Sequence, residues 1–102
     1  MFTDVHDADF EAAVAAVSGG ILICYKKLCP HCKNMEKAME KFAGQVPEAS
    51  LLRMDIEENP AGAAAFEAKR APTLLVIKSG KVAAKKAGLM NPRELRAWYD
   101  AA

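Results

Sequence analysis

All three cysteines of the chain lie close together, and the last two bracket the sequence Cys29-Pro30-His31-Cys32. Two thiols at this spacing can close reversibly into a disulfide, or they can bind a metal ion together with further ligands. They can also be incidental residues at the start of a helix. The C-x-x-C pattern is only moderately specific by itself, so the surrounding elements must decide between these interpretations.

The apolar pattern around the motif predicts a buried strand followed by a helix. The continuous apolar run ILICY (residues 21–25) is typical of a strand buried on both faces. From Pro30 onward, apolar side chains recur at helical spacing up to Gly44. Cys29 is therefore expected at the N-cap, and Pro30 at the first helical position, where a residue without an N–H fits. The two thiols would lie where the strand turns into the helix.

This position would activate one of the two sulfurs. Unpaired N–H groups and the helix dipole favour the Cys29 thiolate, and cysteines so placed have pKa values of roughly 3.5–7.5 against about 8.5 when free. Lys26, Lys27 and Lys33 flank the thiols and can favour the same ionised form. One helical turn brings Cys32 beside Cys29, near the separation that a disulfide needs. We therefore expect a redox-active dithiol.

A metal site fits the sequence less well. Tetrahedral zinc needs four ligands, and beyond the two cysteines and His31 the chain offers only Cys24, inside the expected strand, and the distant His6. A c-type haem needs a histidine directly after the second cysteine, where Lys33 stands. We expect no metal site, and incidental thiols on an inert domain remain an alternative. Cys24 is expected to be a core residue.

The remaining patterns predict a mixed sheet with helices on both faces, in one domain spanning residues 1–102. The expected strands cover residues 2–5, 21–25, 51–56, 73–78 and 81–88, and the expected helices begin near residues 8, 30, 60 and 92. Asp7 is expected to cap the first helix, and Gly19-Gly20 to end it. The last helix is expected to bury Leu95, Trp98 and Tyr99.

Composition and charge exclude several classes of protein. With 102 residues, 52% of them hydrophobic and 26% charged, the chain resembles an ordinary globular protein with one core. A net charge of +1 argues against general nucleic-acid binding. The apolar run AAVAAVSGGILICY is interrupted by Ser-Gly-Gly and follows acidic residues, so we expect neither secretion nor membrane insertion. In the expected cytoplasmic setting, paired cysteines are catalytic or metal-binding rather than structural.

Three segments, CPHCK, DIEENP and APTLLVIKSGKVAAKKAG, occur in the order and at nearly the spacing found in thioredoxins. The resemblance covers almost the whole chain and implies a thioredoxin fold of the α/β class with protein-disulfide reductase activity. It implies that Pro72, before Thr73, is a cis-proline facing the dithiol, and that the backbone of Ala71 pairs with a bound substrate strand. Gly88 corresponds to the glycine of the loop that completes this substrate groove.

The chain also departs from the usual thioredoxin pattern. Leu28 replaces a tryptophan, and Ile23 stands where a buried aspartate is expected, six residues before the first cysteine. Arg53 stands where a lysine near that aspartate would be. The Pro30-His31 pair replaces Gly-Pro, and the resulting Cys-Pro-His-Cys motif is most similar to that of the atypical desulfothioredoxins.

The resemblance implies that Cys29 attacks a substrate disulfide and that Cys32 resolves the mixed disulfide. Because Ile23 cannot assist deprotonation of Cys32, we expect His31, or a water reached by a nearby charged side chain, to do so; alternatively, Pro30 and His31 only tune the couple. Thioredoxin reductase would recharge the dithiol with electrons from NADPH or another reduced carrier, and no bound cofactor is expected. We expect a monomer that acts on disulfide-containing proteins, without nucleic-acid or membrane partners. Alternatives are glutaredoxin-like or disulfide oxidase/isomerase activity, or a redox-inert binding module.

Overall fold

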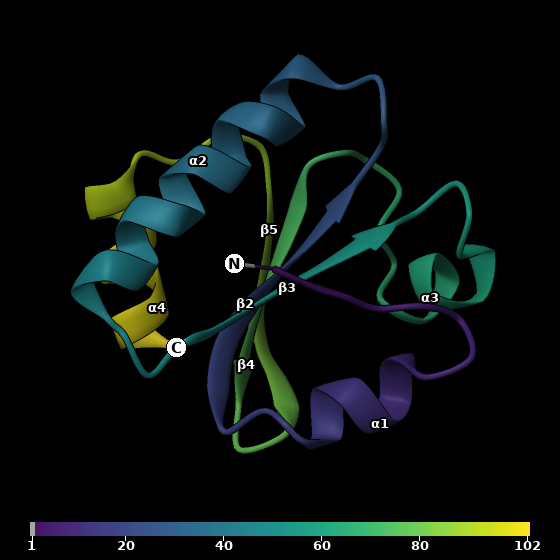
Figure 1. Cartoon of the computed structure of the whole chain (residues 1–102), viewed down its shortest axis with the longest axis horizontal. Coiled ribbons are helices and arrows are strands. Elements are labelled where there is room, and N and C mark those ends of the chain that lie inside the picture. Colours follow the sequence, from purple (N-terminus) through teal and green to yellow (C-terminus); the bar gives the residue numbers. More distant parts are fainter. Residues whose placement is uncertain (1) are drawn as a thin grey trace.

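A mixed five-stranded sheet runs through the part of the chain that the structure, a computed structural model, describes, residues 2–102 (Figure 1). Its strands lie in the spatial order β1-β3-β2-β4-β5. Their bounds are β1 Thr3–Asp4, β2 Gly19–Tyr25, β3 Ser50–Asp55, β4 Thr73–Lys78 and β5 Lys81–Ala87. The helices are α1 Phe10–Ala15, α2 Pro30–Gln45, α3 Pro60–Ala65 and α4 Pro92–Ala101. The predicted α/β architecture is confirmed.

Strand directions follow from the connections between the strands. β3 pairs in parallel with both β1 and β2, and the connection from β2 to β3 contains α2, as a parallel crossover requires. β4 runs antiparallel to β2 and is joined to β5 by a tight turn. In that turn Ser79 and Gly80 both have positive φ, 52° and 75°, which two-residue hairpin turns favour. The predicted hairpin is confirmed.

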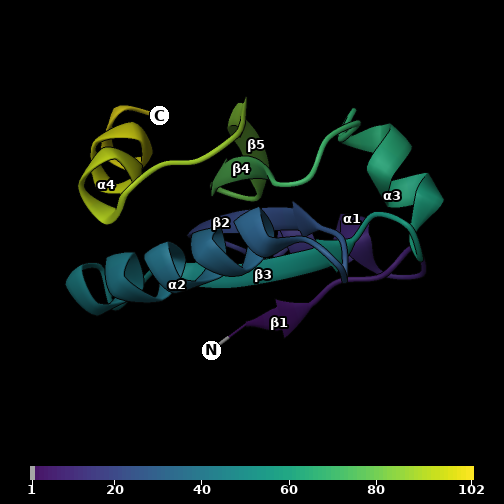
Figure 2. The same cartoon turned by 90° about the horizontal axis from the view of Figure 1, so that it is seen from above.

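Helices cover both faces of the sheet, with α2 and α4 on one face and α1 and α3 on the other (Figures 1 and 2). β2 lies between two apolar layers because its side chains alternate between the faces. Ile21 and Ile23 belong to the cluster under α2 and α4, whereas Leu22 and Cys24 belong to the cluster on the α1 side. Cys24 is a core residue, as predicted.

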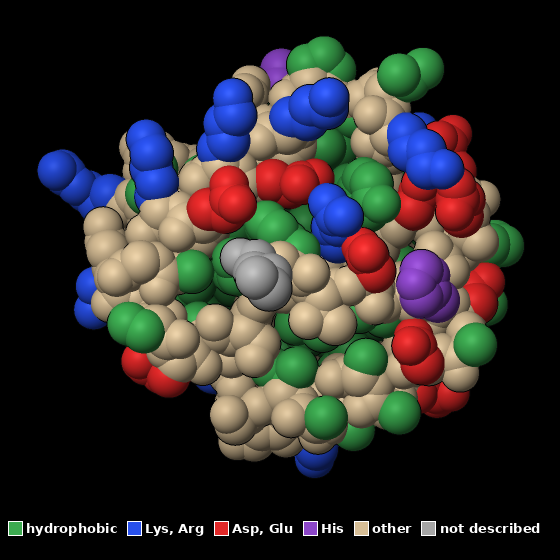
Figure 3. Space-filling model, in the orientation of Figure 1, with side chains coloured by type: hydrophobic (Ala, Val, Ile, Leu, Met, Phe, Trp, Pro, Cys, Tyr) green, Lys and Arg blue, Asp and Glu red, His purple; other side chains and the backbone are tan. Residues whose placement is uncertain are grey.

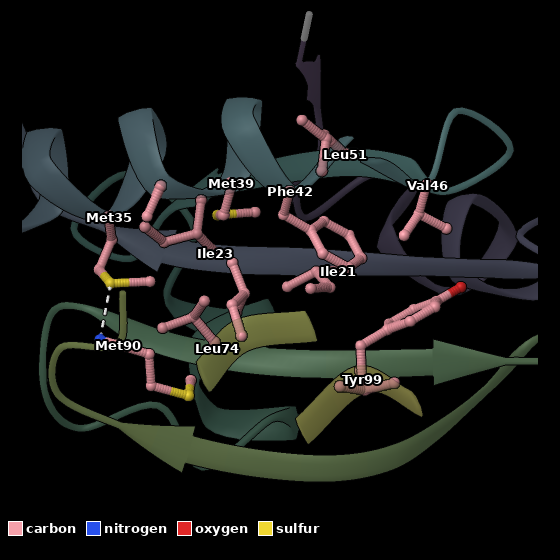
Figure 4. Packing of buried hydrophobic residues seen from close by; sticks show 13 residues of the cluster. Ile21, Ile23, Met35, Met39, Phe42, Val46, Leu51, Leu74, Met90 and Tyr99 are labelled. Atoms are coloured by element: carbon pink, nitrogen blue, oxygen red, sulfur yellow. Dashed lines mark hydrogen bonds between the residues drawn. The ribbon is translucent and has the colours of Figure 1, made fainter. Parts of the chain in front are cut away.

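Helix α4 packs beside α2 over the first of these clusters (Figure 4). The rings of Phe42 and Tyr99 meet edge to face with their centroids 5.0 Å apart. Leu95 and Tyr99 are buried as predicted, but Trp98 is only half-buried. Leu95 and Tyr99 are four residues apart and share one stripe of the helix, so Trp98 lies at the margin of that stripe.

Asp7 does not cap the first helix, contrary to the prediction. α1 begins at Phe10 with Asp9 at its N-cap. The Asp7 carboxylate instead accepts hydrogen bonds from the N–H groups of Ala61 (3.2 Å) and Gly62 (2.7 Å) at the start of α3. The Asp7 N–H donates to Asn59 Oδ1 at 2.8 Å. Asp7 therefore caps a helix that is distant in the sequence. The sequence pattern around Asp7 does not indicate such a partner.

Gly19 and Gly20 also differ from their predicted role. They begin β2 instead of ending a helix, and α1 already ends at Ala15. A Cβ on Gly20 would collide with the backbone oxygen of Ser50 on the neighbouring strand, and a Cβ on Gly19 would meet the Tyr99 hydroxyl. The glycines allow close packing around β2, a requirement that only the assembled fold imposes.

Candidate active site

Cys29 and Cys32 lie at the N-terminus of α2, directly after the loop that leaves β2. Cys29 is the N-cap, with extended backbone (φ −143°, ψ 97°), and Pro30 is the first helical residue. The Cys29 Sγ accepts a hydrogen bond from the backbone N–H of Cys32 at 3.2 Å. The predicted placement of both residues is confirmed, and one orphan N–H of the helix start points at the sulfur.

The two cysteines form a disulfide, and their Cα atoms are 5.3 Å apart. This separation lies within the ordinary range for disulfides. Their surroundings differ, because Cys29 is partly exposed whereas Cys32 is only 1% exposed. An incoming protein can therefore reach the Cys29 sulfur first.

The segment before β4 lies against the dithiol. The peptide bond between Ala71 and Pro72 is cis, as the resemblance implied, and the Ala71 carbonyl oxygen is 3.9 Å from Cys29 Sγ. The Gly88 N–H donates to the Pro72 carbonyl at 3.1 Å, and Gly88 has a φ of 102°, which favours glycine. Thr73 begins β4, and its hydroxyl donates to the backbone of the preceding loop. The structure thus brings together the residues that the resemblance assigned to the groove.

Two pockets lie beside the dithiol, and only the second has Cys29 in its wall. One, of about 270 Å³, is lined by His31, Pro72, Gly88 and Leu89, among others. The other, of about 420 Å³, is formed by residues 27–30 and Lys33. Leu28 and Leu89 are exposed to 99% and 53%, and each lines one of the pockets. Sequence reasoning missed Leu89, because nothing in the local pattern shows that its side chain faces the groove.

Ile23 is fully buried and belongs to the apolar cluster under α2 (Figure 4). Beside Cys32 lies a separate pocket of about 390 Å³, lined by Tyr25, Glu36 and Arg53 as well as several lysines. Sequence reasoning missed Glu36, although its spacing of four residues from Cys32 places both on one face of the helix.

Cys24 and His6 take no part in this arrangement. Burial raises the pKa of Cys24 to about 12, and this residue lies in the cluster on the α1 side. His6 is exposed before α1. Among residues 2–102, no group of three or more His, Cys, Asp or Glu side chains is arranged to hold a metal ion. Within the same range, no helix is both long enough and apolar enough to cross a membrane.

A family model of thioredoxin matches residues 1–101 of the chain. The chain belongs to the thioredoxin family. It is 33% identical over 89 residues to thioredoxin-1 of Saccharomyces cerevisiae, covering 87% of this chain and 85% of the relative. It is 36% identical over 92 residues to a thioredoxin of Staphylococcus aureus, with 88% and 86% covered.

Solved structures agree with this membership. The solution structure of reduced desulfothioredoxin from Desulfovibrio vulgaris Hildenborough is 41% identical, with a TM-score of 0.83 and coverage of 90% of this chain and 88% of that one. A mutant thioredoxin from Halobacterium salinarum shares the fold at 22% identity, with a TM-score of 0.87 and coverage of 98% and 88%. The family match and the curated relatives, together with the Cys29–Cys32 disulfide, make the chain a thiol–disulfide oxidoreductase.

Proposed function

We propose that the chain reduces disulfides in other proteins, with Cys29 as the attacking thiolate and Cys32 as the resolving thiol. The unequal exposure of the two sulfurs carries this assignment: Cys29 is reachable from outside, whereas Cys32 is buried behind it. The Cys32 N–H, which donates to Cys29 Sγ, stabilises negative charge on the attacking sulfur.

The reaction then runs in two exchanges. The Cys29 thiolate attacks one sulfur of the substrate disulfide, so that a mixed disulfide forms and the first substrate sulfur leaves as a thiolate that takes up a proton. Cys32 loses its proton and attacks Cys29 Sγ. The Cys29–Cys32 bond forms, the mixed disulfide breaks, and the second substrate sulfur leaves. Two electrons pass from the dithiol to the substrate.

Ala71, Pro72, Thr73 and Gly88 form the proposed substrate groove. The Ala71 backbone would pair with an extended substrate segment, which brings the substrate disulfide to the adjacent Cys29 sulfur. Exposed Leu28 and Leu89 support this assignment, since apolar side chains on either side of the dithiol suit protein substrates.

Pro30 and His31 are proposed to tune the couple. His31 lines the groove pocket with Pro72, while other side chains line the pocket beside Cys32. This arrangement favours electrostatic tuning of Cys29 over a base role toward Cys32.

The reductant and the cellular setting are also proposals. A thioredoxin reductase would recharge the dithiol with electrons from NADPH or another reduced carrier, and no bound cofactor would be needed. The protein would act in the cytoplasm as a monomer and as a single domain, on disulfide-containing proteins, with neither nucleic acid nor membrane as partner.

Trapping with single-cysteine variants tests the two roles. Cys32→Ser should accumulate a stable mixed disulfide with a protein substrate such as insulin, because the bond formed by Cys29 cannot be resolved. Cys29→Ser should form none, and both variants should lose catalytic turnover. Accumulation in the Cys29→Ser variant instead, or turnover by either variant, would contradict the assignment.

A further inference from the structure

Cys32 lines a solvent-accessible space that is distinct from the substrate groove. The pocket of about 390 Å³ beside α2 includes Cys32, Glu36 and Arg53 in its wall, and Tyr25 also lines it. Cys32 itself is almost completely buried, and Ile23, which stands where an aspartate was expected, has no polar side-chain atom. A proton that leaves the Cys32 thiol therefore needs an acceptor reached through this pocket.

Few groups in the pocket wall can accept a proton. Lysine and arginine side chains are donors only. Burial raises the pKa of Tyr25, so its hydroxyl stays protonated. The remaining candidates are two carboxylates, Glu36 and Glu40. Along the helix, Glu36 is one turn from Cys32 (about 6 Å of rise) and Glu40 is two turns away (about 12 Å).

Arg53 holds the carboxylate of Glu36, the one nearer to Cys32, in place. Its Nη1 lies 3.5 Å from Glu36 Oε1, and the Glu36 side chain is only 21% exposed. Arg53 is itself held by a hydrogen bond from its Nε to Asp4 at 2.6 Å and lies over the ring of Tyr25. The hydrogen bond to Asp4 raises the pKa of Arg53, so the guanidinium remains charged. Glu36 is thus a positioned carboxylate at the pocket wall.

We propose that Glu36, positioned by Arg53, accepts the Cys32 proton through solvent in this pocket during the resolving step. The inference rests on the proposed roles of Cys29 and Cys32. The Cys32 S–H bond breaks and the proton passes through water in the pocket to the Glu36 carboxylate. The Cys32 thiolate then attacks Cys29 Sγ, and the departing substrate sulfur takes a proton from solvent. Glu36 finally releases its proton to solvent.

Other charged side chains surround Glu36 and act on the resolving step as well. On its own helix these are Lys33, Lys37 and Glu40, all lining the pocket. From β1 and β3, Asp4 and Arg53 complete the ion-pair chain.

Two further groups of charges come from the ends of β2 and β3. Lys26 and Lys27 follow β2 and line the pocket, and Lys27 is paired with Glu58. Asp55, at the end of β3, is buried, and its Oδ2 has no hydrogen-bond partner among the described residues. Asp55 does not line the pocket, but its unpartnered oxygen makes it the rival carboxylate that an experiment must test.

The decisive measurement is the rate at which Cys32 resolves a preformed mixed disulfide, followed in a single turnover across pH. Glu36→Gln should slow this step on the order of 10²-fold near neutral pH, with the rate recovering as hydroxide increases. Glu36→Asp should restore part of the rate. Glu40→Gln, which removes the same charge one turn further away, is the matched control and should stay within about two-fold of the parent.

A second readout separates proton transfer from a mere change of charge. In a Cys29→Ser background, Glu36→Gln removes a negative neighbour, so the Cys32 thiolate absorbance should appear at lower pH. Cys24 does not interfere, because burial raises the pKa of Cys24 to about 12. Easier ionisation combined with slower resolution identifies a lost proton acceptor, since a purely electrostatic role would make resolution faster.

The resolution rates of these variants identify the proton acceptor of Cys32. If Glu36→Gln is folded and its resolution rate and pH profile match the parent, the proposal is overturned. If Asp55→Asn alone causes the slowing, Asp55 is the acceptor and Glu36 is not. The first exchange, measured by mixed-disulfide formation in Cys32→Ser with and without Glu36→Gln, should be unchanged. If no mixed disulfide forms even with Glu36 present, the proposed cysteine roles fail instead.

Discussion

His31 lies between the two cysteines in sequence and lines the groove pocket with Pro72 and Gly88. A histidine in this position can stabilise the Cys29 thiolate and hence the reduced form, which raises the reduction potential. His31→Pro should therefore make the protein more reducing, by on the order of 30 mV for each tenfold change in the equilibrium constant. Equilibration with glutathione buffers measures the potential.

His6 provides the control for that measurement. It is exposed, precedes α1 and lines neither of the two groove pockets in the described part of the chain. His6→Ala should leave the reduction potential unchanged. A His31→Pro variant with an unchanged potential would rule out tuning by the histidine.

Cys24 should not react with thiol reagents in the folded protein. It is completely buried in β2, and that burial raises the pKa of Cys24 to about 12. With the dithiol reduced, iodoacetamide at about pH 8 should modify Cys29 and leave Cys24 untouched. In denaturant, all three cysteines should react. Peptide mass spectrometry distinguishes the sites, and labelling of Cys24 in native protein would contradict its placement in the core.

At the scale of elements, Asp7 links the N-terminal segment to α3. Its carboxylate accepts two N–H groups from the first turn of α3, so Asp7→Ala leaves both donors without this partner. The expected loss is about 1–2 kcal/mol of unfolding free energy, as for other helix caps. Urea denaturation measures it. Glu11→Ala, at an exposed position in α1, should change stability by less than about 0.5 kcal/mol; an equal loss would show that the cap contributes nothing.

Sequence reasoning succeeded where an element depends on its own residues. The β2 strand, the N-cap Cys29 and the hairpin turn at Ser79 all follow from local pattern, and all three are present. It failed where a residue contacts an element that is distant in the sequence. Asp7 and its partner Gly62 are 55 positions apart. A glycine is needed at position 20 because the backbone there packs closely against β3. Such long-range contacts have no periodic signature, so only the fold reveals them.

The same distinction applies to the active site as a whole. Local chemistry indicated Cys29 and Cys32, because the motif and its helix start are contiguous. Pro72 and Gly88 come to the dithiol from the two ends of the β4–β5 hairpin, and family resemblance alone pointed to them. The Glu36–Arg53 pair joins α2 to β3 and required the structure.

At the scale of the whole molecule, charge is unevenly distributed around the substrate groove. Figure 3 shows Lys and Arg side chains gathered along the edge formed by α2. Lys27 and Lys33 line one groove pocket and Arg70 the other, and neither pocket has an acidic lining residue within residues 2–102. Lys27 is paired with Glu58, whereas Lys33 and Arg70 form no ion pair in that range. The groove therefore presents net positive charge to a partner.

Protein disulfides flanked by acidic residues should accordingly be reduced faster than those flanked by basic residues. For an acidic substrate, kcat/KM should fall several-fold as ionic strength rises from about 0.01 M to about 0.5 M, because salt screens exposed charges. Lys33→Glu combined with Arg70→Glu should reverse the preference between matched acidic and basic peptide disulfides. Lys81→Glu, next to the turn that joins β4 to β5, changes net charge without lining either groove pocket and serves as the control. If the control alters the preference as much as the groove variant does, net charge rather than the groove determines which substrates are favoured.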